Sequence, residues 1–196
     1  NFDFNNNLIK KNLFLGYKSI HKDNQTFFEN IFSVKNGENI FVDINLNIKK
    51  EIYWKPKLSI DNKMKYPDAV SNTLDLICKS LKLRLRADVP IAFCLSGGVD
   101  SSLLASLAKK KLNLDINTFS IYDNDERYNE LENIKLINSN LKSNSTIIDI
   151  TKLKSNFLKK VEEITLYHDS PLATISYYVH ALLTEKISKN FKVTIS

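Results

Sequence analysis

The stretch IAFCLSGGVDSSLLASLAKK, residues 91–110, sets the expected fold. Its first residues form an apolar run typical of a buried strand, and its second half repeats apolar residues at the spacing of an amphipathic helix. Gly97 and Gly98 allow a tight turn between the two. Ligands of an α/β sheet bind at the carboxyl end of such a strand, so this turn is the candidate binding site.

The composition of the turn favours a phosphate or pyrophosphate ligand. The N–H groups of a glycine turn converge on an anion, and the following helix, expected from about Ser101, adds the positive end of its dipole. The turn lacks the Gly-Lys-Ser/Thr ending of a Walker A loop and the glycine spacing of a Rossmann loop. Hydroxyl donors are expected from Ser96, Ser101 and Ser102.

Asp100 is a carboxylate within this anion-binding turn. It is useful there if Mg²⁺ bridges it to the phosphates, because this hard cation prefers oxygen ligands. The alternative is that Asp100 only caps the helix and the glycines only turn the chain.

From residue 89 to residue 195, strand patterns alternate with helix patterns. Strict alternation predicts a parallel sheet with helices over its faces. The expected strands lie near 89–95, 116–121, 146–150 and 191–195, and the expected helices near 101–111, 126–140, 152–167 and 174–188. A further amphipathic helix is expected from Val70 to a point before Pro90.

Short strands are expected within residues 11–54, and residues 1–54 are expected to be an incomplete domain. Asn36 and Gly37 tolerate the positive φ of a tight turn, which predicts a hairpin between the apolar runs on either side of them. So few strands cannot bury a core, so we expect exposed apolar strand faces and an incomplete domain. The apolar runs are 13–15, 31–34 and 40–44.

Bulk composition argues against several classes of protein. With 43% apolar and 26% charged side chains, the chain is expected to fold rather than remain disordered. No window approaches the roughly 18 apolar residues of a membrane-spanning helix, so we expect a soluble, cytoplasmic protein. The net charge of +6 is spread over every segment, which argues against nucleic-acid binding. The histidines lack metal-ligand spacing, and Cys78 and Cys94 lie in apolar runs typical of buried, inert thiols.

The loop SGGVDSS, residues 96–102, resembles the pyrophosphate-binding loop of the ATP pyrophosphatases. The wider stretch RLRADVPIAFCLSGGVDSSLLASLA, residues 84–108, is similar to the version found in glutamine-dependent asparagine synthetases. The Tyr53-Trp54 pair resembles the point where that family's glutaminase domain is followed by its synthetase domain. The resemblance covers nearly the whole chain from about residue 12.

This resemblance implies an α/β fold of the adenine nucleotide alpha hydrolase type, preceded by the β-rich tail of a glutaminase domain. Residues 1–55 would be the C-terminal part of an Ntn-type glutamine amidotransferase domain, and residues 56–68 a linker. Residues 69–196 would be the N-terminal part of the ATP-pyrophosphatase domain.

The resemblance also implies a set of ATP-binding residues. Asp100 would additionally contact Mg²⁺ through the magnesium pyrophosphate, and Ile121 would meet the adenine through its main chain. Leu95 and Ile121 are apolar, as ordinary core strand residues are. The implied ATP-binding residues are Leu95, Ser96, Gly97, Gly98, Asp100, Ser101, Ser102 and Ile121.

The implied reaction converts aspartate, glutamine and ATP to asparagine, glutamate, AMP and pyrophosphate through a β-aspartyl-AMP intermediate. The partners would be ATP with Mg²⁺, aspartate or another carboxylic acid, and glutamine-derived ammonia, and a homodimer of the whole protein is compatible with this. The alternatives are a relative that amidates another carboxylate, such as a sugar acid in polysaccharide synthesis, and a non-catalytic nucleotide-binding module. A tRNA-modifying relative would need a concentrated basic and aromatic surface, which the sequence lacks.

The chain resembles a piece of such an enzyme. It starts at Asn1 without the N-terminal cysteine of the glutaminase, and Ser196 resembles the first residue of the family's second glycine- and acid-rich segment. We therefore expect no catalytic residue within these 196 residues, poor ATP binding and no turnover by the piece alone.

Further acidic residues follow the expected strand at 116–121 and the expected helix at 152–167. Asp123, Asp125 and Glu126 either face the nucleotide or, for the last two, cap the next helix, which its dipole favours. Asp169 resembles the acidic position of the family's D-E-P segment, but Ser170 departs from that pattern. Simple termination of the helix is an equal interpretation of Asp169.

Overall fold

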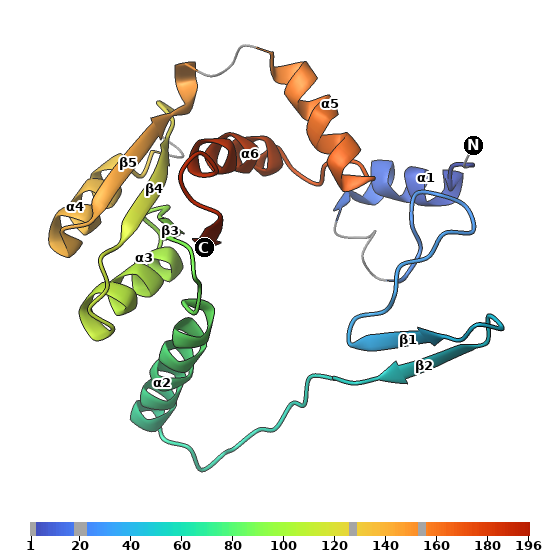
Figure 1. Ribbon diagram of the computed structural model, residues 1–196, viewed down its shortest axis with the longest axis horizontal. Helices are drawn as coiled ribbons and strands as arrows, with labels where there is room; N and C mark the ends of the chain where they lie inside the picture. The colour runs from blue at the N-terminus through green and yellow to red at the C-terminus, as the bar shows by residue number, and fades with distance from the viewer. Residues whose placement is uncertain (1–2, 18–22, 126–128, 153–155) are drawn as a thin grey trace. The chain divides into compact units, whose positions relative to one another are not determined.

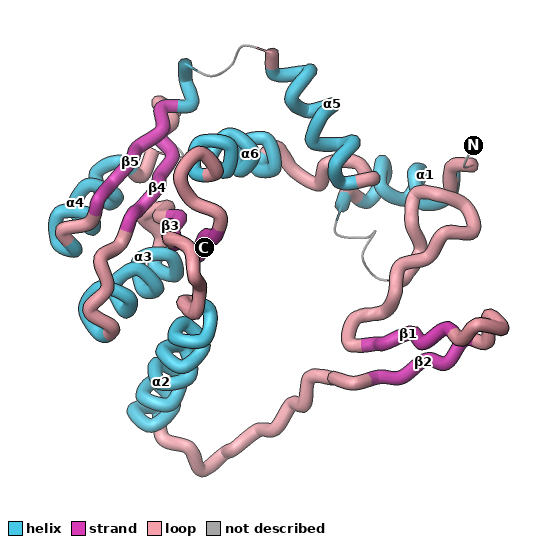
Figure 2. The backbone as a smooth tube through the Cα atoms, viewed as in Figure 1, coloured by secondary structure: helices cyan, strands magenta, loops and turns pink. Residues whose placement is uncertain are grey.

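The computed structural model describes residues 3–17, 23–125, 129–152 and 156–196 (Figures 1 and 2). The chain divides into two compact units. The smaller unit holds Asn1–Lys63 with His168–Thr174, and the larger holds Met64–Tyr167 with Ile175–Ser196.

The larger unit is built on a four-stranded sheet with the strand order β5-β4-β3-β6. Every neighbouring pair of strands is parallel, which confirms the predicted parallel sheet. Such pairing requires a crossover between strands, and helices supply it. The strands are β3 (Ile91–Cys94), β4 (Asn117–Tyr122), β5 (Asn144–Asp149) and β6 (Val193–Ile195).

Helices cover both faces of this sheet. Phe93 packs with residues of α2 and α3, whereas its neighbour Ala92 packs with residues of α6, because successive strand residues point to opposite faces. Figure 1 shows α3 and α4 on one side of the sheet and α6 on the other. The helices are α2 (Tyr66–Arg84), α3 (Val99–Ser106), α4 (Leu131–Leu141), α5 (Phe157–His168) and α6 (Ser176–Ile187), with a π-helical turn (Leu107–Lys111) after α3 and a short 3₁₀ helix (Ile150–Lys152) after β5.

All five helix starts of the larger unit differ from those expected, with α5 beginning at Phe157 rather than near 152 and α6 at Ser176 rather than near 174. α2 begins at Tyr66, inside the predicted linker, with Pro67 in its first turn, where proline's fixed φ suits a helix and its missing N–H costs no bond. α3 begins at Val99, two residues before Ser101. α4 begins at Leu131 rather than at residue 126, although 126–128 lie outside the described residues.

The smaller unit begins with a helix, α1 (Asn6–Leu15), so the expectation of short strands was wrong for residues 13–15. Asn5 caps this helix by accepting a hydrogen bond from the Leu8 N–H at 3.0 Å. Leu8 and Phe27 are buried together and form a small core. Leu13, Phe14 and Leu15 are exposed at the end of α1. This apolar run is therefore not a buried strand.

The predicted hairpin pairs different strands from those expected. β1 (Glu38–Val42) and β2 (Ile48–Ile52) are antiparallel, and residues 43–47 connect them. Asn36 and Gly37 do form a turn with φ +71° at Gly37, but this turn precedes β1. A Cβ on Gly37 would lie 2.2 Å from the Trp54 carbonyl oxygen, so the glycine is needed for close approach to the end of the hairpin.

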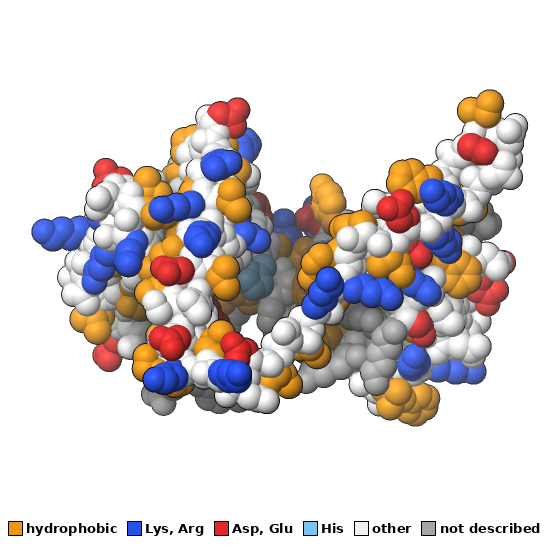
Figure 3. Space-filling model, turned by 90° about the horizontal axis from the view of Figure 1, so that it is seen from below, with side chains coloured by type: hydrophobic (Ala, Val, Ile, Leu, Met, Phe, Trp, Pro, Cys, Tyr) orange, Lys and Arg blue, Asp and Glu red, His pale blue; other side chains and the backbone are white. Residues whose placement is uncertain are grey.

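Apolar side chains of the hairpin are exposed, as the sequence predicts. Phe41 is 50% and Ile48 is 64% exposed, and every residue of β2 is exposed. Figure 3 shows hydrophobic side chains among the charged ones on the face drawn there. Among the described residues, no helix is both long and apolar enough to cross a membrane.

Asp43 organises the loop between β1 and β2. Its Oδ1 accepts hydrogen bonds from the N–H groups of Asn45 and Asn47 at 2.9 and 2.8 Å, and its Oδ2 accepts one from Asn47 Nδ2 at 2.8 Å. The bond from the Asn47 side chain, followed by the one from its backbone, lowers the pKa of Asp43 below the ordinary value of 3.8. The folded loop therefore favours the ionised carboxylate.

We expect acid to loosen this hairpin loop. Because the pKa of Asp43 is lower in the folded loop than in the unfolded chain, its stabilising effect is complete above about pH 4 and is lost as the pH falls through the folded pKa. Amide chemical shifts of Asn45 and Asn47 should follow this titration, and Asp43→Asn should abolish their pH dependence. Shifts that titrate equally in the Asn variant would contradict this.

Candidate nucleotide-binding loop

The loop from Ser96 to Ser102 lies at the carboxyl end of β3, as the sequence predicts. Gly97 adopts φ +83°, a conformation that side-chain-bearing residues rarely reach. Gly98 is the N-cap of α3, so Val99, Asp100 and Ser101 form the first turn of the helix. The N–H groups of a first turn have no carbonyl acceptor within the helix, because no helical turn precedes them. These amides and the positive end of the helix form an anion-binding group.

Hydrogen bonds among the serines hold the loop together. The Ser96 and Ser101 hydroxyls lie 3.0 Å apart, and Ser101 Oγ also accepts the Ser96 N–H at 3.2 Å. The Gly98 carbonyl accepts from Ser102 Oγ at 2.6 Å and from Ser101 Oγ at 3.3 Å. The three predicted hydroxyl donors therefore lie together, and an arriving phosphate would compete with the Ser96–Ser101 hydrogen bond.

Leu95 and Ile121 lie at the carboxyl ends of neighbouring strands. The Leu95 N–H donates to the Phe119 carbonyl at 2.9 Å, and its side chain is 1% exposed in the cluster beneath α2 and α3. Ile121 packs partly against the opposite cluster, which contains α6. Because their side chains belong to the core, these residues can meet a ligand at the sheet edge mainly through main-chain groups. Their assignment as ATP contacts stays a prediction.

Asp100 is the acidic residue of the first turn of α3, and it is exposed. An exposed carboxylate beside the amides of the first turn of α3 fits a shared magnesium ion, because Mg²⁺ commonly takes one or two protein carboxylates and fills its other positions with phosphate oxygens and waters. No cluster of three or more His, Cys, Asp or Glu side chains occurs in the described part of the chain. A dedicated all-protein metal cage is therefore not part of the described site.

The other acidic candidates have different surroundings. Asp123 accepts the Asp125 N–H at 3.2 Å and so forms a local turn after β4. The N-cap of α4 is Glu130, so the expectation that Asp125 caps this helix was wrong, and Glu126 lies outside the described residues. Asp169, at φ +49°, follows the last residue of α5 and belongs to the smaller unit.

Packing of α4 against the loop was not predicted from the sequence. A Cβ built on Gly97 would lie 3.2 Å from Glu130 Cβ, 3.3 Å from Ile134 Cγ1 and 3.4 Å from Asn133 Cβ. Ile134 is 1% exposed, so the contact belongs to a packed region. The helical spacing of Ile134, Asn138 and Leu141 marks their shared buried face, but it does not say which segment that face covers.

Cys94 is the last residue of β3 and is partly buried. Burial raises the pKa of its thiol, so at neutral pH the group is the protonated, weakly nucleophilic form. This agrees with the sequence-based view of an inert thiol.

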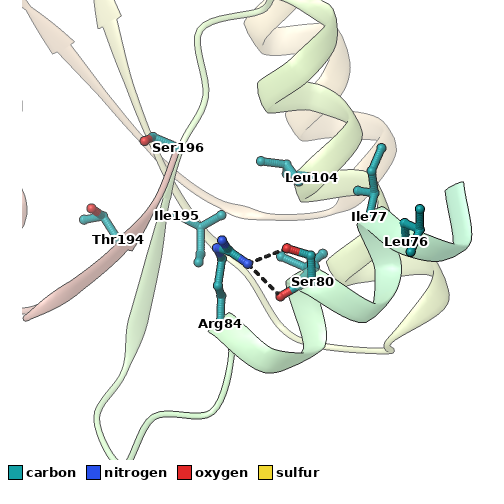
Figure 4. A pocket seen from close by; sticks show the side chains of 9 residues that line it. Leu76, Ile77, Ser80, Arg84, Leu104, Thr194, Ile195 and Ser196 are labelled. Atoms are coloured by element: carbon teal, nitrogen blue, oxygen red, sulfur yellow. Dashed lines mark hydrogen bonds between the residues drawn. The ribbon is translucent and has the colours of Figure 1, made fainter. Parts of the chain in front are cut away.

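A separate pocket of about 570 Å³ lies between α2, α3 and β6 (Figure 4). The Arg84 guanidinium donates to the hydroxyl of Ser80 and to its carbonyl, the latter at 3.4 Å. Ser196 lines this pocket, and none of the predicted residues of the loop does.

Comparison with known proteins relates the larger unit to one family. Residues 72–196 match the sequence model of the asparagine synthase family. Asparagine synthetase [glutamine-hydrolyzing] 1 of Bacillus subtilis is 26% identical over 79% of this chain and 23% of its own length. Putative asparagine synthetase [glutamine-hydrolyzing] 2 of Methanocaldococcus jannaschii is 25% identical over 87% of this chain and 33% of its own length.

Two further similarities are weaker, one because it covers less of the chain and the other because the two folds superpose less well. Amidase chry2 of Gibberella zeae is 30% identical over 43% of this chain and 13% of its own length. The solved structure of an NH3-dependent NAD synthetase from Campylobacter jejuni, in complex with nitrate ion, covers 68% of this chain and 56% of that one, with a TM-score of 0.43 and 20% identity. The chain thus spans a third or less of the length of each of these three sequence relatives.

Proposed function

Because the chain belongs to the asparagine synthase family, we propose that it supplies the nucleotide-binding loop of a larger enzyme that forms amides with ATP. The proposed reaction converts aspartate, glutamine and ATP to asparagine, glutamate, AMP and pyrophosphate. Residues 69–196 would be the first part of the synthetase domain, residues 56–68 a linker, and residues 1–55 the last part of a glutaminase domain.

The proposed chemistry has two steps at the synthetase site. The β-carboxylate oxygen of aspartate attacks the α-phosphorus of ATP, the bond to the β-phosphate breaks, and pyrophosphate leaves. Ammonia then attacks the carboxyl carbon of β-aspartyl-AMP, loses a proton, and AMP leaves. Adenylation helps because AMP is a far better leaving group than hydroxide or oxide.

The loop between β3 and α3 carries this proposal. Charge builds up on the departing pyrophosphate, and the amides of Val99, Asp100 and Ser101 are already aimed from the helix terminus, so little reorganisation is needed to bind that charge. Asp100 would hold Mg²⁺, which when bound would neutralise further phosphate charge. Ser96 and Ser102 would supply hydroxyls from the loop's two ends.

A second candidate is a related enzyme that amidates another carboxylate. Its support is that the relatives do not all carry the name asparagine synthetase: the 30%-identical one from Gibberella zeae is named an amidase, so the names of the relatives do not fix aspartate as the acceptor. In both candidates the loop would contact the phosphates of ATP and not the acceptor, so its geometry fits both equally.

Pyrophosphate release by the whole protein that carries this chain tests the proposal. We expect release with ATP, Mg²⁺ and an ammonia source only when aspartate is present, and asparagine should form in equal amount. Release driven by a sugar acid but not by aspartate would favour the second candidate. Nucleotide binding with no release for any of a panel of carboxylic acids would indicate a non-catalytic module and contradict both.

A further inference from the structure

The start of α4 lies against the nucleotide-binding loop at Gly97, the loop residue with a positive φ. Gly97 has three side-chain neighbours from the start of α4, at Glu130, Asn133 and Ile134, within 3.2–3.4 Å of where its Cβ would be. α4 therefore lies directly beside the loop and leaves no room for a side chain at Gly97, so a movement of α4 changes the surroundings of this residue.

Asn138 fixes α4 to the sheet one helical turn beyond this contact. It is 8% exposed, and its Oδ1 accepts a hydrogen bond from Thr118 Oγ1 of β4 at 2.6 Å. The same oxygen accepts from Ser143 Oγ, and the Asn138 carbonyl accepts the Ser143 N–H at 3.2 Å. Thr118 is fully buried, so its bond to Asn138 forms away from solvent, whereas the bond from Ser143 is partly buried. One side chain thus joins α4, β4 and the turn into β5.

We propose that Asn138 is a positioning residue for the nucleotide loop, acting through α4. Asn138 and Ile134 are four residues apart, hence about 6 Å along one buried helix face, and Ile134 Cγ1 lies 3.3 Å from where a Cβ of Gly97 would be. Losing the bonds at Asn138 frees α4 to slide or rotate over β4, and Gly97 follows. This inference rests on the proposed function of the loop as a pyrophosphate site.

The hydrogen-bond pattern shows which atom of Asn138 matters. Both hydroxyls donate to Oδ1, whereas the buried Nδ2 has no hydrogen-bond partner among the described residues. The anchor is therefore the acceptor oxygen. Asn138→Leu keeps a similar volume but removes this acceptor, which leaves the buried Thr118 hydroxyl with only the partly buried Ser143 hydroxyl, 3.5 Å away. Thr118→Val keeps the shape of β4 and removes one donor, so it is the milder variant.

Leu183→Ala is the matched control. Leu183 is 4% exposed on α6 and packs against the opposite face of the sheet, so its truncation destabilises the same unit without touching α4. The three variants would be made in the whole protein that carries this chain. Thermal melting, binding of inorganic pyrophosphate with Mg²⁺, and hydrogen exchange of the Gly97 and Gly98 amides would be measured for each.

We expect Asn138→Leu to weaken pyrophosphate binding by roughly 2- to 30-fold, with a smaller loss for Thr118→Val and none for Leu183→Ala at a similar fall in melting temperature. Exchange at Gly97 and Gly98 should accelerate in the first two variants only. Equal effects of Leu183→Ala and the α4 variants would overturn the positioning role and leave only a stability role. If the unsubstituted protein fails to bind pyrophosphate, the proposed function falls, and the exchange rates still decide whether α4 holds the loop.

Discussion

Gly97→Ala should remove most of the affinity of the whole protein for MgATP. Alanine at φ +83° is strained by about 1–2 kcal/mol, and its methyl group would press against Glu130, Asn133 and Ile134 at 3.2–3.4 Å. Overpacking of this kind typically costs about 1–3 kcal/mol. The loop can relieve the backbone strain and the overpacking by moving residue 97 away from α4. This movement would point the loop amides away from the position of the phosphate. We expect at least roughly a tenfold loss in binding.

Gly98→Ala is the control for this prediction. Gly98 has φ −72°, which alanine adopts without strain, and a Cβ there would meet only Ser96 Oγ, the end of a rotatable side chain, at 3.3 Å. We expect it to cost less than about 1 kcal/mol in unfolding free energy, since alanine is only a poorer N-cap than glycine. Isothermal titration of MgATP would compare the two variants. Equal losses at both positions would show that the left-handed turn and the α4 contact are not what shapes the site.

The parallel sheet could be predicted because its information is local. The apolar run before Leu95 and the spacing of Leu103, Leu104 and Leu107 each identify an element without reference to the rest of the chain. Alternation of such elements leaves few topologies, since parallel strands need crossovers. The helix starts were less well predicted, because Pro67 reads equally as a loop residue and as the first turn of a helix.

The smaller unit shows where local patterns mislead. Asn36 and Gly37 carry a strong hairpin signal, but the strands are joined instead by residues 43–47, where the Asp43 carboxylate collects three hydrogen bonds and Leu46 takes φ +63°. Asp43, Asn45 and Asn47 are turn-forming residue types, but leucine rarely adopts a positive φ, so the sequence did not mark Leu46 as part of that turn. Turn propensity was outweighed by side-chain hydrogen bonds that depend on the folded loop.

The candidate loop was predicted by composition, but its support was not. Ser96, Gly97 and Asp100 lie within five residues, so their meeting needs no knowledge of the fold. The contact between Gly97 and Ile134 joins residues far apart in sequence, and the pairing of Thr118 with Asn138 joins two elements that a sequence pattern cannot dock together. Such contacts depend on how α4 lies on β4, which a single sequence leaves open.

Asp100→Asn should abolish pyrophosphate release by the whole protein while leaving the fold nearly unchanged. Asparagine has almost the same shape, and Asp100 is exposed, so packing is not disturbed. The lost charge would weaken the hold on Mg²⁺ next to the amides of α3, where the leaving pyrophosphate needs it. We expect the rate of pyrophosphate release to fall by roughly 100-fold or more, as for loss of other preorganised charge-stabilising groups.

Asp68→Asn separates this role from a simple helix effect. Asp68 is the acidic residue in the first turn of α2, as Asp100 is in the first turn of α3, so both substitutions remove a favourable interaction of about 0.3–1 kcal/mol with a helix dipole. Only Asp100→Asn should slow pyrophosphate release, and glutamate release from glutamine should persist in both variants, because that step needs no ATP chemistry. Equal and small effects of the two substitutions would mean that Asp100 only stabilises the start of α3. The magnesium assignment would then be wrong, and phosphate binding by the loop would rest on its amides and serine hydroxyls alone.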